Sequence, residues 1–347
     1  MQSPASASAR TTQPILRIEN LRTQYFDKKS ILKAVDNVSL ELYPGEILGI
    51  VGESGCGKTT LGLSILNLIP HPGSIESGAI YFRDRDVLTM SGGELRDLRG
   101  REISMIFQDP VAGLNPVLSV GDQVQEIITA HSGVDKREAR RMATDLLADM
   151  GLADPERVAG RYPFQLSGGM AQRVMIATAM ALKPAILIAD EPTSALDMTV
   201  QAQILEELRK LRNQGVAILL ITHDLGVIAQ MADRVAVMYA GRLAETSDAD
   251  YLFERPRHPY TWALLQSLPR LNQDLGRLRQ VGGRPPDMTK LPDQCAFAPR
   301  CPKVRNECRQ LDSPPLEEIE PGHYVACYNP MYHADPDDDD EDDEDST

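Results

Sequence analysis

The chain has 347 residues, and its hydrophobic content of 42% is enough for a sizeable core in one large or two modest domains. Its net charge is −14, but the last thirteen residues hold ten acids and no base, so the rest of the chain carries only −4. Nothing in these values favours nucleic acid as the main partner, because binding a duplex needs clustered Lys and Arg. The sequence has no run of 18 apolar residues, so we expect no membrane span.

Both ends of the chain are predicted to lie outside the folded body. Residues 1–14 have no apolar signal core and are interpreted as a disordered leader. Residues 331–347 are interpreted as a disordered acidic tail, with binding of a divalent cation or a partner as the alternative. We therefore expect the protein in the cytosol or on the cytosolic face of a membrane.

The first predicted elements are strands. Residues 14–26 and 34–46 alternate apolar and polar residues, as paired antiparallel strands do. Residues 46–52, "EILGIVG", form a continuous apolar run that ends in glycine, which is typical of a buried strand. From Lys58 onward the apolar spacing predicts a helix.

Helices and buried strands follow in alternation. A short strand is predicted at 102–108, and residues 120–182 are predicted to be mostly helical. Buried strands are predicted in "AILIADE", "VAILLITHD" and "DRVAVMYAG", with an amphipathic helix after the first of them that Gly215 ends. This order predicts an α/β fold with a parallel sheet and covering helices.

The composition changes after about residue 255. A short helix framed by prolines is predicted within 256–271, and the segment up to residue 330 is rich in Pro and Cys with little periodicity. We therefore predict a main domain over 15–255, with its helical block at about 109–165, and a small Cys/Pro-rich extension over 256–330.

The stretch "GESGCGKTT" follows the first buried strand and fits the pattern G-x-x-x-x-G-K-[ST]. Backbone N–H groups must turn inward around phosphate oxygens there, so the residues must be small. We expect Lys58 to reach the outer phosphates and Thr59 to offer its hydroxyl to Mg²⁺. The alternative, a simple glycine turn, does not explain the strand before and the helix after. Cys56 is interpreted as a small filler, with a redox switch as the alternative.

Two acids follow the strand in "AILIADE". Asp190 stands at the strand's end, where a carboxylate for Mg²⁺ is expected, and Glu191 is placed to polarise an attacking water. A helix cap is the alternative interpretation of such a pair.

A second anion site is predicted at "LSGGM", where Ser167, Gly168 and Gly169 begin a long helix. One nucleotide does not need two such sites in one chain. We therefore expect this site to serve a nucleotide that a second subunit holds.

With these motifs in this order, residues from about 15 to 270 resemble the ATP-binding subunit of an ABC transporter. The resemblance implies the P-loop ABC ATPase cassette, with a parallel core sheet, an antiparallel β subdomain and a helical subdomain. It also implies ATP and Mg²⁺ as ligands and a Walker A loop of Gly52, Glu53, Ser54, Gly55, Cys56, Gly57, Lys58, Thr59 and Thr60.

The resemblance implies roles for further residues. Tyr25 resembles the aromatic residue that stacks on adenine, and Gln108 the glutamine that touches Mg²⁺ and senses the membrane subunit. "SALD" at 194–197 resembles the loop at the dimer interface, and His223 the switch histidine that contacts the γ-phosphate. Taken alone, such a residue is more often an ordinary histidine at a strand end, but the position of His223 after a predicted core strand favours the functional interpretation.

The chain departs from the family pattern at two positions. Met170 ends the signature where the commonest form has Gln, and Phe164 stands where His is common. Neither change removes a group that contacts phosphate. Since Glu191 and His223 are both present, we expect this chain's own Walker site to hydrolyse ATP.

The extension holds four cysteines, Cys295, Cys301, Cys308 and Cys327, in the spacing C-x5-C-x6-C-x18-C. Four thiolates suit an iron–sulfur cluster or zinc, and a cytosolic chain does not normally hold disulfides. This segment resembles the C-terminal extension of oligopeptide and dipeptide permease ATPase subunits, which implies a [4Fe–4S] cluster. Zinc and free thiols are the alternatives, and His323 could replace one ligand.

The resemblance implies an ATP-driven importer motor, most simply for dipeptides or oligopeptides. It implies a heterodimer with a sister ABC ATPase subunit, two transmembrane permease subunits and an external solute-binding protein, at the cytoplasmic face of the cell membrane. Nickel, glutathione-like compounds or oligosaccharides are alternative cargoes. A soluble ABC ATPase and a non-hydrolysing regulatory subunit are the alternatives from other classes.

Overall fold

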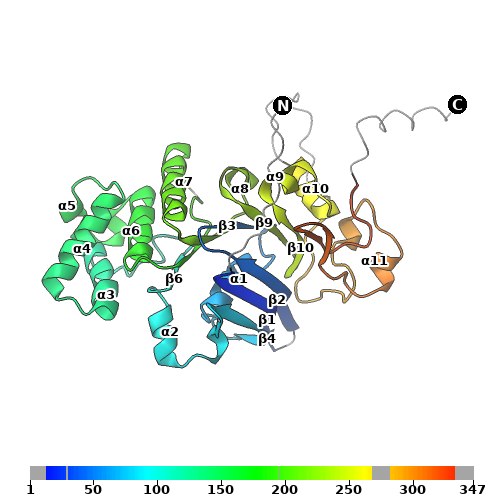
Figure 1. The fold of residues 1–347 in the computed structure, drawn as a ribbon, viewed down its shortest axis with the longest axis horizontal. Coiled ribbons are helices and arrows are strands. Elements are labelled where there is room, and N and C mark those ends of the chain that lie inside the picture. The colour runs from blue at the N-terminus through cyan, green and yellow to red at the C-terminus, as the bar shows by residue number, and fades with distance from the viewer. Residues whose placement is uncertain (1–12, 29, 195, 268–281, 333–347) are drawn as a thin grey trace.

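The structure, a computed structural model, describes residues 13–28, 30–194, 196–267 and 282–332. Two β-sheets lie at its centre, a helical lobe lies at one end and the C-terminal extension at the other (Figure 1). Most of the predicted leader and of the predicted acidic tail lies outside the described residues. No helix in the described ranges is long and apolar enough to cross a membrane.

The larger sheet has eight strands in the order β11-β12-β10-β9-β3-β8-β7-β6. The five strands from β9 to β6 are parallel, and β10, β12 and β11 continue the sheet in antiparallel fashion. Its members are β3 (Ile47–Val51), β6 (Ile103–Ile106), β7 (Ile186–Asp190), β8 (Ala217–Ile221), β9 (Arg234–Tyr239), β10 (Arg242–Asp248), β11 (Glu317–Glu320) and β12 (His323–Val325).

The parallel strands are apolar throughout because both faces of the sheet are covered. In β8, Ile218 and Leu220 join the core on one face, while Ala217, Leu219 and Ile221 join the core on the other. Each side chain of these strands is therefore buried from solvent, whichever face of the sheet it points to. The continuous apolar runs of the sequence are confirmed as core strands.

One face of this sheet is covered by α1 and by the second, antiparallel sheet, whose strands have the order β2-β1-β4-β5. The hydroxyls of Thr23 and Ser64, 2.9 Å apart, join this second sheet to α1. The bounds on this side are β1 (Leu16–Asp27), β2 (Ser30–Leu42), β4 (Gly73–Phe82), β5 (Arg85–Asp86), α1 (Lys58–Ile65), a 3-10 turn (Val87–Thr89) and α2 (Gly92–Leu98).

Helices cover the opposite face, and a helical lobe extends beyond β6 (Figure 1). The lobe has a small apolar core of its own, to which Val124, Ile128, Ala139 and Ala143 contribute. The helices are α3 (Val120–Ser132), α4 (Lys136–Asp149), α5 (Pro155–Ala159), a 3-10 turn (Pro163–Gln165), α6 (Gly168–Met180), α7 (Met198–Asn213), α8 (Leu225–Met231) and α9 (Ala249–Glu254).

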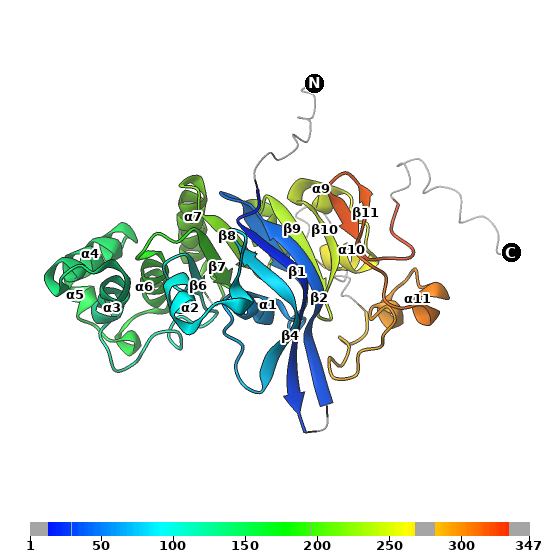
Figure 2. The same cartoon turned by 60° about the horizontal axis from the view of Figure 1, so that its bottom comes forward.

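The C-terminal extension adds its hairpin to the edge of the larger sheet (Figure 2). Strand β12 pairs with β10, so that Glu245 lies opposite Val325 and Thr246 opposite Tyr324. The remaining elements are α10 (Pro259–Gln266), a 3-10 turn (Ala298–Arg300) and α11 (Glu307–Gln310). The extension therefore shares a sheet with the main domain, and the predicted boundary at 255 does not separate two cores.

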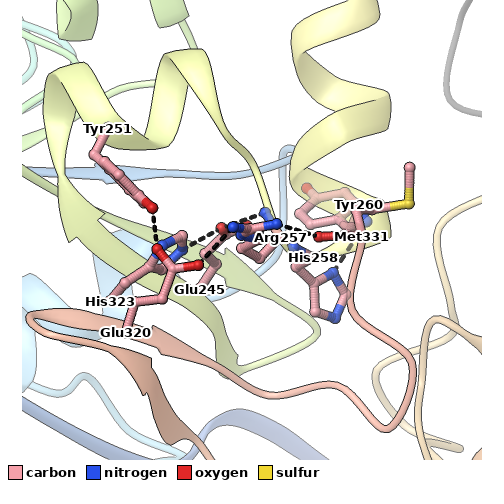
Figure 3. A network of polar contacts seen from close by, with 8 residues as sticks. All are labelled: Glu245, Tyr251, Arg257, His258, Tyr260, Glu320, His323 and Met331. Atoms are coloured by element: carbon pink, nitrogen blue, oxygen red, sulfur yellow. Dashed lines mark hydrogen bonds and ion pairs between the residues drawn. The ribbon is translucent and has the colours of Figure 1, made fainter. Parts of the chain in front are cut away.

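A buried polar network anchors the hairpin (Figure 3). The carboxylate of Glu245, fully buried on β10, accepts hydrogen bonds from the backbone N–H groups of Arg257 and His258 at 2.7 and 2.9 Å. It also lies 2.7 Å from Nε2 of the buried His323 on β12. Arg257 in turn donates to Glu320 of β11 at 2.5 Å. A buried carboxylate is tolerated here because several donors surround it.

Replacing the central acid should loosen this anchor. Glu245→Ala leaves buried donors without an acceptor, and we expect the free energy of unfolding to fall by about 3 to 5 kcal/mol. Urea unfolding followed by circular dichroism measures this loss.

The matched control is Glu317→Ala, which removes an exposed carboxylate from the same hairpin. This control should change stability by less than about 0.5 kcal/mol. Equal losses for the two variants would contradict the anchoring role of Glu245.

Candidate functional site

The predicted site residues gather at one edge of the larger sheet. Strands β3, β8 and β7 are parallel neighbours, so their carboxyl ends meet there. The glycine-rich loop follows β3, Asp190 ends β7, and His223 follows β8 by two residues. In open parallel sheets, ligands bind at such an edge.

The loop after β3 packs so closely on its neighbours that two positions need glycine. A β-carbon on Gly52 would lie 2.1 Å from the backbone oxygen of Met238, and one on Gly57 would lie 1.9 Å from that of Ala34. Gly57 also has φ +107°, which side chains rarely adopt. These close approaches leave no room for a side chain at either position, and α1 begins directly after the loop at Lys58.

The side chain of Lys58 is buried within the loop. Its Nζ donates to the carbonyl oxygens of Gly52 at 2.8 Å and Glu53 at 3.1 Å, and lies 3.9 Å from Sγ of Cys56. The ammonium group thus stays at the concave side of the loop, where it can meet an anion. Burial raises the pKa of the Cys56 thiol, which keeps it protonated and favours the filler interpretation.

A hydroxyl and a buried carboxylate lie side by side next to the loop. Asp190 is 1% exposed, its side chain is hydrogen-bonded to that of Thr59, and burial raises its pKa. Among the residues that the structure describes, its Oδ1 has no hydrogen-bond partner. An unpaired carboxylate oxygen beside a hydroxyl provides the hard oxygen ligands that Mg²⁺ prefers, so these residues fit that ion.

Glu191 is bound to His223. The carboxylate accepts from the backbone N–H of His223 at 3.1 Å and lies 2.7 Å from its Nδ1, while Oγ1 of Thr222 donates to it at 3.3 Å. The imidazole is 66% exposed and the Glu191 side chain only 10%. The ring can therefore turn into solvent while the carboxylate stays in place.

The signature segment lies on a different part of the chain's surface. The Oγ of Ser167 accepts from the N–H of Met170 at 3.3 Å and caps α6, and Ser167 and Gly168 are exposed. Gly169 approaches Val200 so closely that a β-carbon would lie 2.9 Å from its Cγ1. In the described part of the chain, no hydrogen bond joins this segment to the glycine-rich loop. The structure leaves it open to a second subunit.

Three further residues of the predicted site form none of the hydrogen bonds described above for the glycine-rich loop. Tyr25, on β1, is half-buried and packs against Gly73. Gln108 is exposed, two residues after β6. Asp197 caps α7 through its side chain, while the neighbouring residue 195 lies outside the described residues.

Two residues that the sequence analysis did not single out contact the loop from the C-terminal extension. The guanidinium of Arg300 donates to both carboxylate oxygens of Glu53, at 2.7 and 2.8 Å. The hydroxyl of Tyr260 accepts from the N–H of Glu53 at 2.9 Å. The Arg300–Glu53 contact has one weak signal in the sequence, which is the position of Arg300 between Cys295 and Cys301.

The four cysteines of the extension line one small cavity of about 10 Å³. All four are free thiols, and burial raises the pKa of Cys295, of Cys301 and, to about 12, of Cys327. Within the described ranges, no group of three or more His, Cys, Asp or Glu side chains is arranged to hold a metal ion. His323 does not line this cavity, because it is bonded to Glu245.

Comparison with protein families gives two matches. Residues 35–194 match the family described as ABC transporter, and residues 244–308 match the family described as oligopeptide/dipeptide transporter, C-terminal region. The second match spans the junction between β10 and the extension, together with three of the four cysteines.

Individual proteins resemble the chain over most of its length. It is 44% identical over 318 residues to the dipeptide transport ATP-binding protein DppD of Escherichia coli K12, covering 91% of this chain and 97% of that protein. It is also 44% identical to the oligopeptide transport ATP-binding protein AppD of Bacillus subtilis, covering 90% and 96%.

Solved structures share the fold of the main domain. The ATP-binding cassette MJ0796, solved as a dimer bound to ADP and phosphate, is 30% identical with a TM-score of 0.62, over 67% of this chain and 98% of that one. The cbiO1 protein of Clostridium perfringens, part of the ABC transporter complex cbiONQ, is 26% identical with a TM-score of 0.59, over 70% and 91%.

Proposed function

The chain belongs to the ABC transporter ATP-binding proteins of the dipeptide and oligopeptide type, and we propose that it is the motor subunit of a peptide importer. The assignment as an ATPase is supported by the position of four residues at the carboxyl ends of adjacent parallel strands: Lys58, Asp190, Glu191 and His223. The cargo is assigned from the relatives' names and from the matched C-terminal region.

ATP binding is assigned to the glycine-rich loop. The backbone N–H groups from Ser54 to Thr60 and the helix dipole of α1 would hold the phosphates, with Lys58 as the cation for the outer ones. Tyr25 is assigned to the adenine ring. Mg²⁺, when bound, offsets the charge on the phosphate oxygens, and Thr59, Asp190 and Gln108 would be its protein ligands.

Hydrolysis is assigned to Glu191 as the base that orients and polarises the attacking water. In the structure, Nδ1 of the exposed His223 ring lies 2.7 Å from one carboxylate oxygen of Glu191 and forms a hydrogen bond with it. The ring would leave that oxygen for the γ-phosphate when ATP is present. The same movement would free Glu191 for water, so that ATP binding and activation of the base occur together.

A second ATPase subunit is needed to complete the site. Ser167, Gly168 and Gly169 are separated from this chain's own loop, and the solved cassette MJ0796 is a dimer. We assign this segment to the nucleotide of a sister ATPase. Two permease subunits, an external solute-binding protein and a position at the cytoplasmic face of the membrane complete the proposed assembly.

The test of the hydrolytic site is Glu191→Gln. The amide keeps the shape of the side chain but cannot take a proton from water, so ATP hydrolysis should fall at least ~100-fold. MgATP binding should persist, and a nucleotide-dependent dimer should accumulate on size-exclusion chromatography.

Glu206→Gln, on the exposed face of α7, is the matched control and should hydrolyse ATP at the normal rate. Unchanged hydrolysis in Glu191→Gln would show that another group activates the water.

We further propose that the four cysteines hold a metal centre, with a [4Fe–4S] cluster as the main hypothesis and zinc as the alternative. The donor set supports either, because thiolates bind both. Since no group of three or more His, Cys, Asp or Glu side chains in the described ranges is arranged to hold a metal, either centre would require the cysteine side chains to rearrange around it. No step of hydrolysis is assigned to this centre.

Metal analysis after purification without oxygen tests this proposal. A cluster predicts absorbance near ~400 nm with about four iron and four sulfide per chain, whereas zinc predicts about one ion and no colour. Cys308→Ser should lose the metal, and Cys56→Ser, outside the cavity, should keep it. A chain with neither metal would contradict the proposal.

A further inference from the structure

The Walker A loop has an outer side that faces the C-terminal extension. Glu53 is the second residue of the loop, and its carboxylate binds Arg300 of the extension, while its carbonyl oxygen accepts from Lys58. Arg300 meets the carboxylate with two parallel hydrogen bonds of 2.7 and 2.8 Å. The Arg300 side chain is 5% exposed and that of Glu53 is 21% exposed, so the pair is largely shielded from water. Such paired contacts fix orientation as well as distance.

Aromatic residues hold Arg300 in place. Its guanidinium lies over the rings of Tyr239 and Phe297, and it donates to the Tyr239 hydroxyl at 3.3 Å. The rings of Tyr239, Tyr260 and Phe297 contact one another, with centroids 4.5 to 5.4 Å apart. Tyr260 also holds the backbone of Glu53, so the loop is fixed at this residue by a main-chain and a side-chain contact.

The segment that carries Arg300 is itself tied down. Arg300 ends a 3-10 turn between Cys295 and Cys301, both of which line the cysteine cavity. Its Nε donates to the carbonyl oxygen of Gly282 at 2.8 Å. Arg300 is therefore held at its backbone by the turn next to Cys301 and at its side chain by Gly282 and Glu53.

We propose that Arg300 is a positioning residue for nucleotide binding, which holds the Walker A loop in its phosphate-binding shape through Glu53. A glycine-rich loop has many conformations, and ordering it on binding costs affinity. A loop ordered beforehand avoids that cost. The proposal rests on ATP binding at this loop, and it assigns Arg300 no contact with ATP.

The contact is separate from the anchor of the extension. The hairpin is attached through Glu245, His323 and the β10–β12 pairing. Loss of Arg300 should therefore leave the extension docked, and it should weaken ATP binding without unfolding the chain.

The experiment measures MgATP affinity of the full-length chain by isothermal titration calorimetry. Arg300→Gln and Glu53→Gln should each weaken binding about tenfold, and the double variant should be no weaker than either single one, because both remove the same contact. Arg300→Lys, which keeps the charge but not the paired geometry, should recover part of the affinity. Arg305→Gln, exposed in the same extension, is the matched control.

Two further readouts separate positioning from a general structural role. In ATPase assays Arg300→Gln should raise KM with kcat unchanged, and its circular dichroism spectrum at the assay temperature should match that of the wild type. Additive losses in the double variant, or wild-type affinity in Arg300→Gln, would overturn the proposal. If the wild-type chain itself failed to bind MgATP, or if Lys58→Ala bound it normally, the assignment of the nucleotide site would fail instead.

Discussion

The fixed path of the loop around the Lys58 ammonium is the constraint on which the other features of the site depend. The loop can close around Nζ only because Gly52 and Gly57 let its backbone touch the backbones at Met238 and Ala34. Those neighbours lie on β9 and β2, one in each sheet. The two sheets and α1 must therefore pack correctly before a phosphate site exists, and the apolar cores on both faces of β3 provide that packing.

The C-terminal extension continues this arrangement on the outer side of the loop. Its hairpin adds two strands to the larger sheet, its aromatic cluster packs behind the loop, and Arg300 reaches Glu53. Buried polar contacts such as those of Glu245 need every partner in place, so they specify one docked position. An extension with so little regular structure thus obtains its fold largely from the main domain.

Local sequence patterns predicted the strands that bury side chains on both faces of the sheet. They did not predict strands whose pairing partner is distant in the sequence. The runs around β3, β7 and β8 are apolar without interruption, so both the α/β class and the strand positions could be predicted. In β4, only the final residues alternate clearly, and the strand pairs with the distant β1. Nothing near Glu53 in the sequence indicates Arg300, 247 residues later, because an ion pair leaves no periodic signal. The role of Ser167 in binding a partner's nucleotide depends on a second chain, so the fold of a single chain does not test it.

Contacts from the extension are proposed to keep the Walker A loop ordered before nucleotide arrives. Amide hydrogen exchange of the nucleotide-free chain, followed by mass spectrometry on peptides covering residues 52–60, measures this order. We expect faster exchange in this loop for Arg300→Gln than for the wild type, with β3, β8 and the β10–β12 pairing unchanged. Equal exchange in the loop would show that the glycine contacts alone order it and would contradict the role of Arg300.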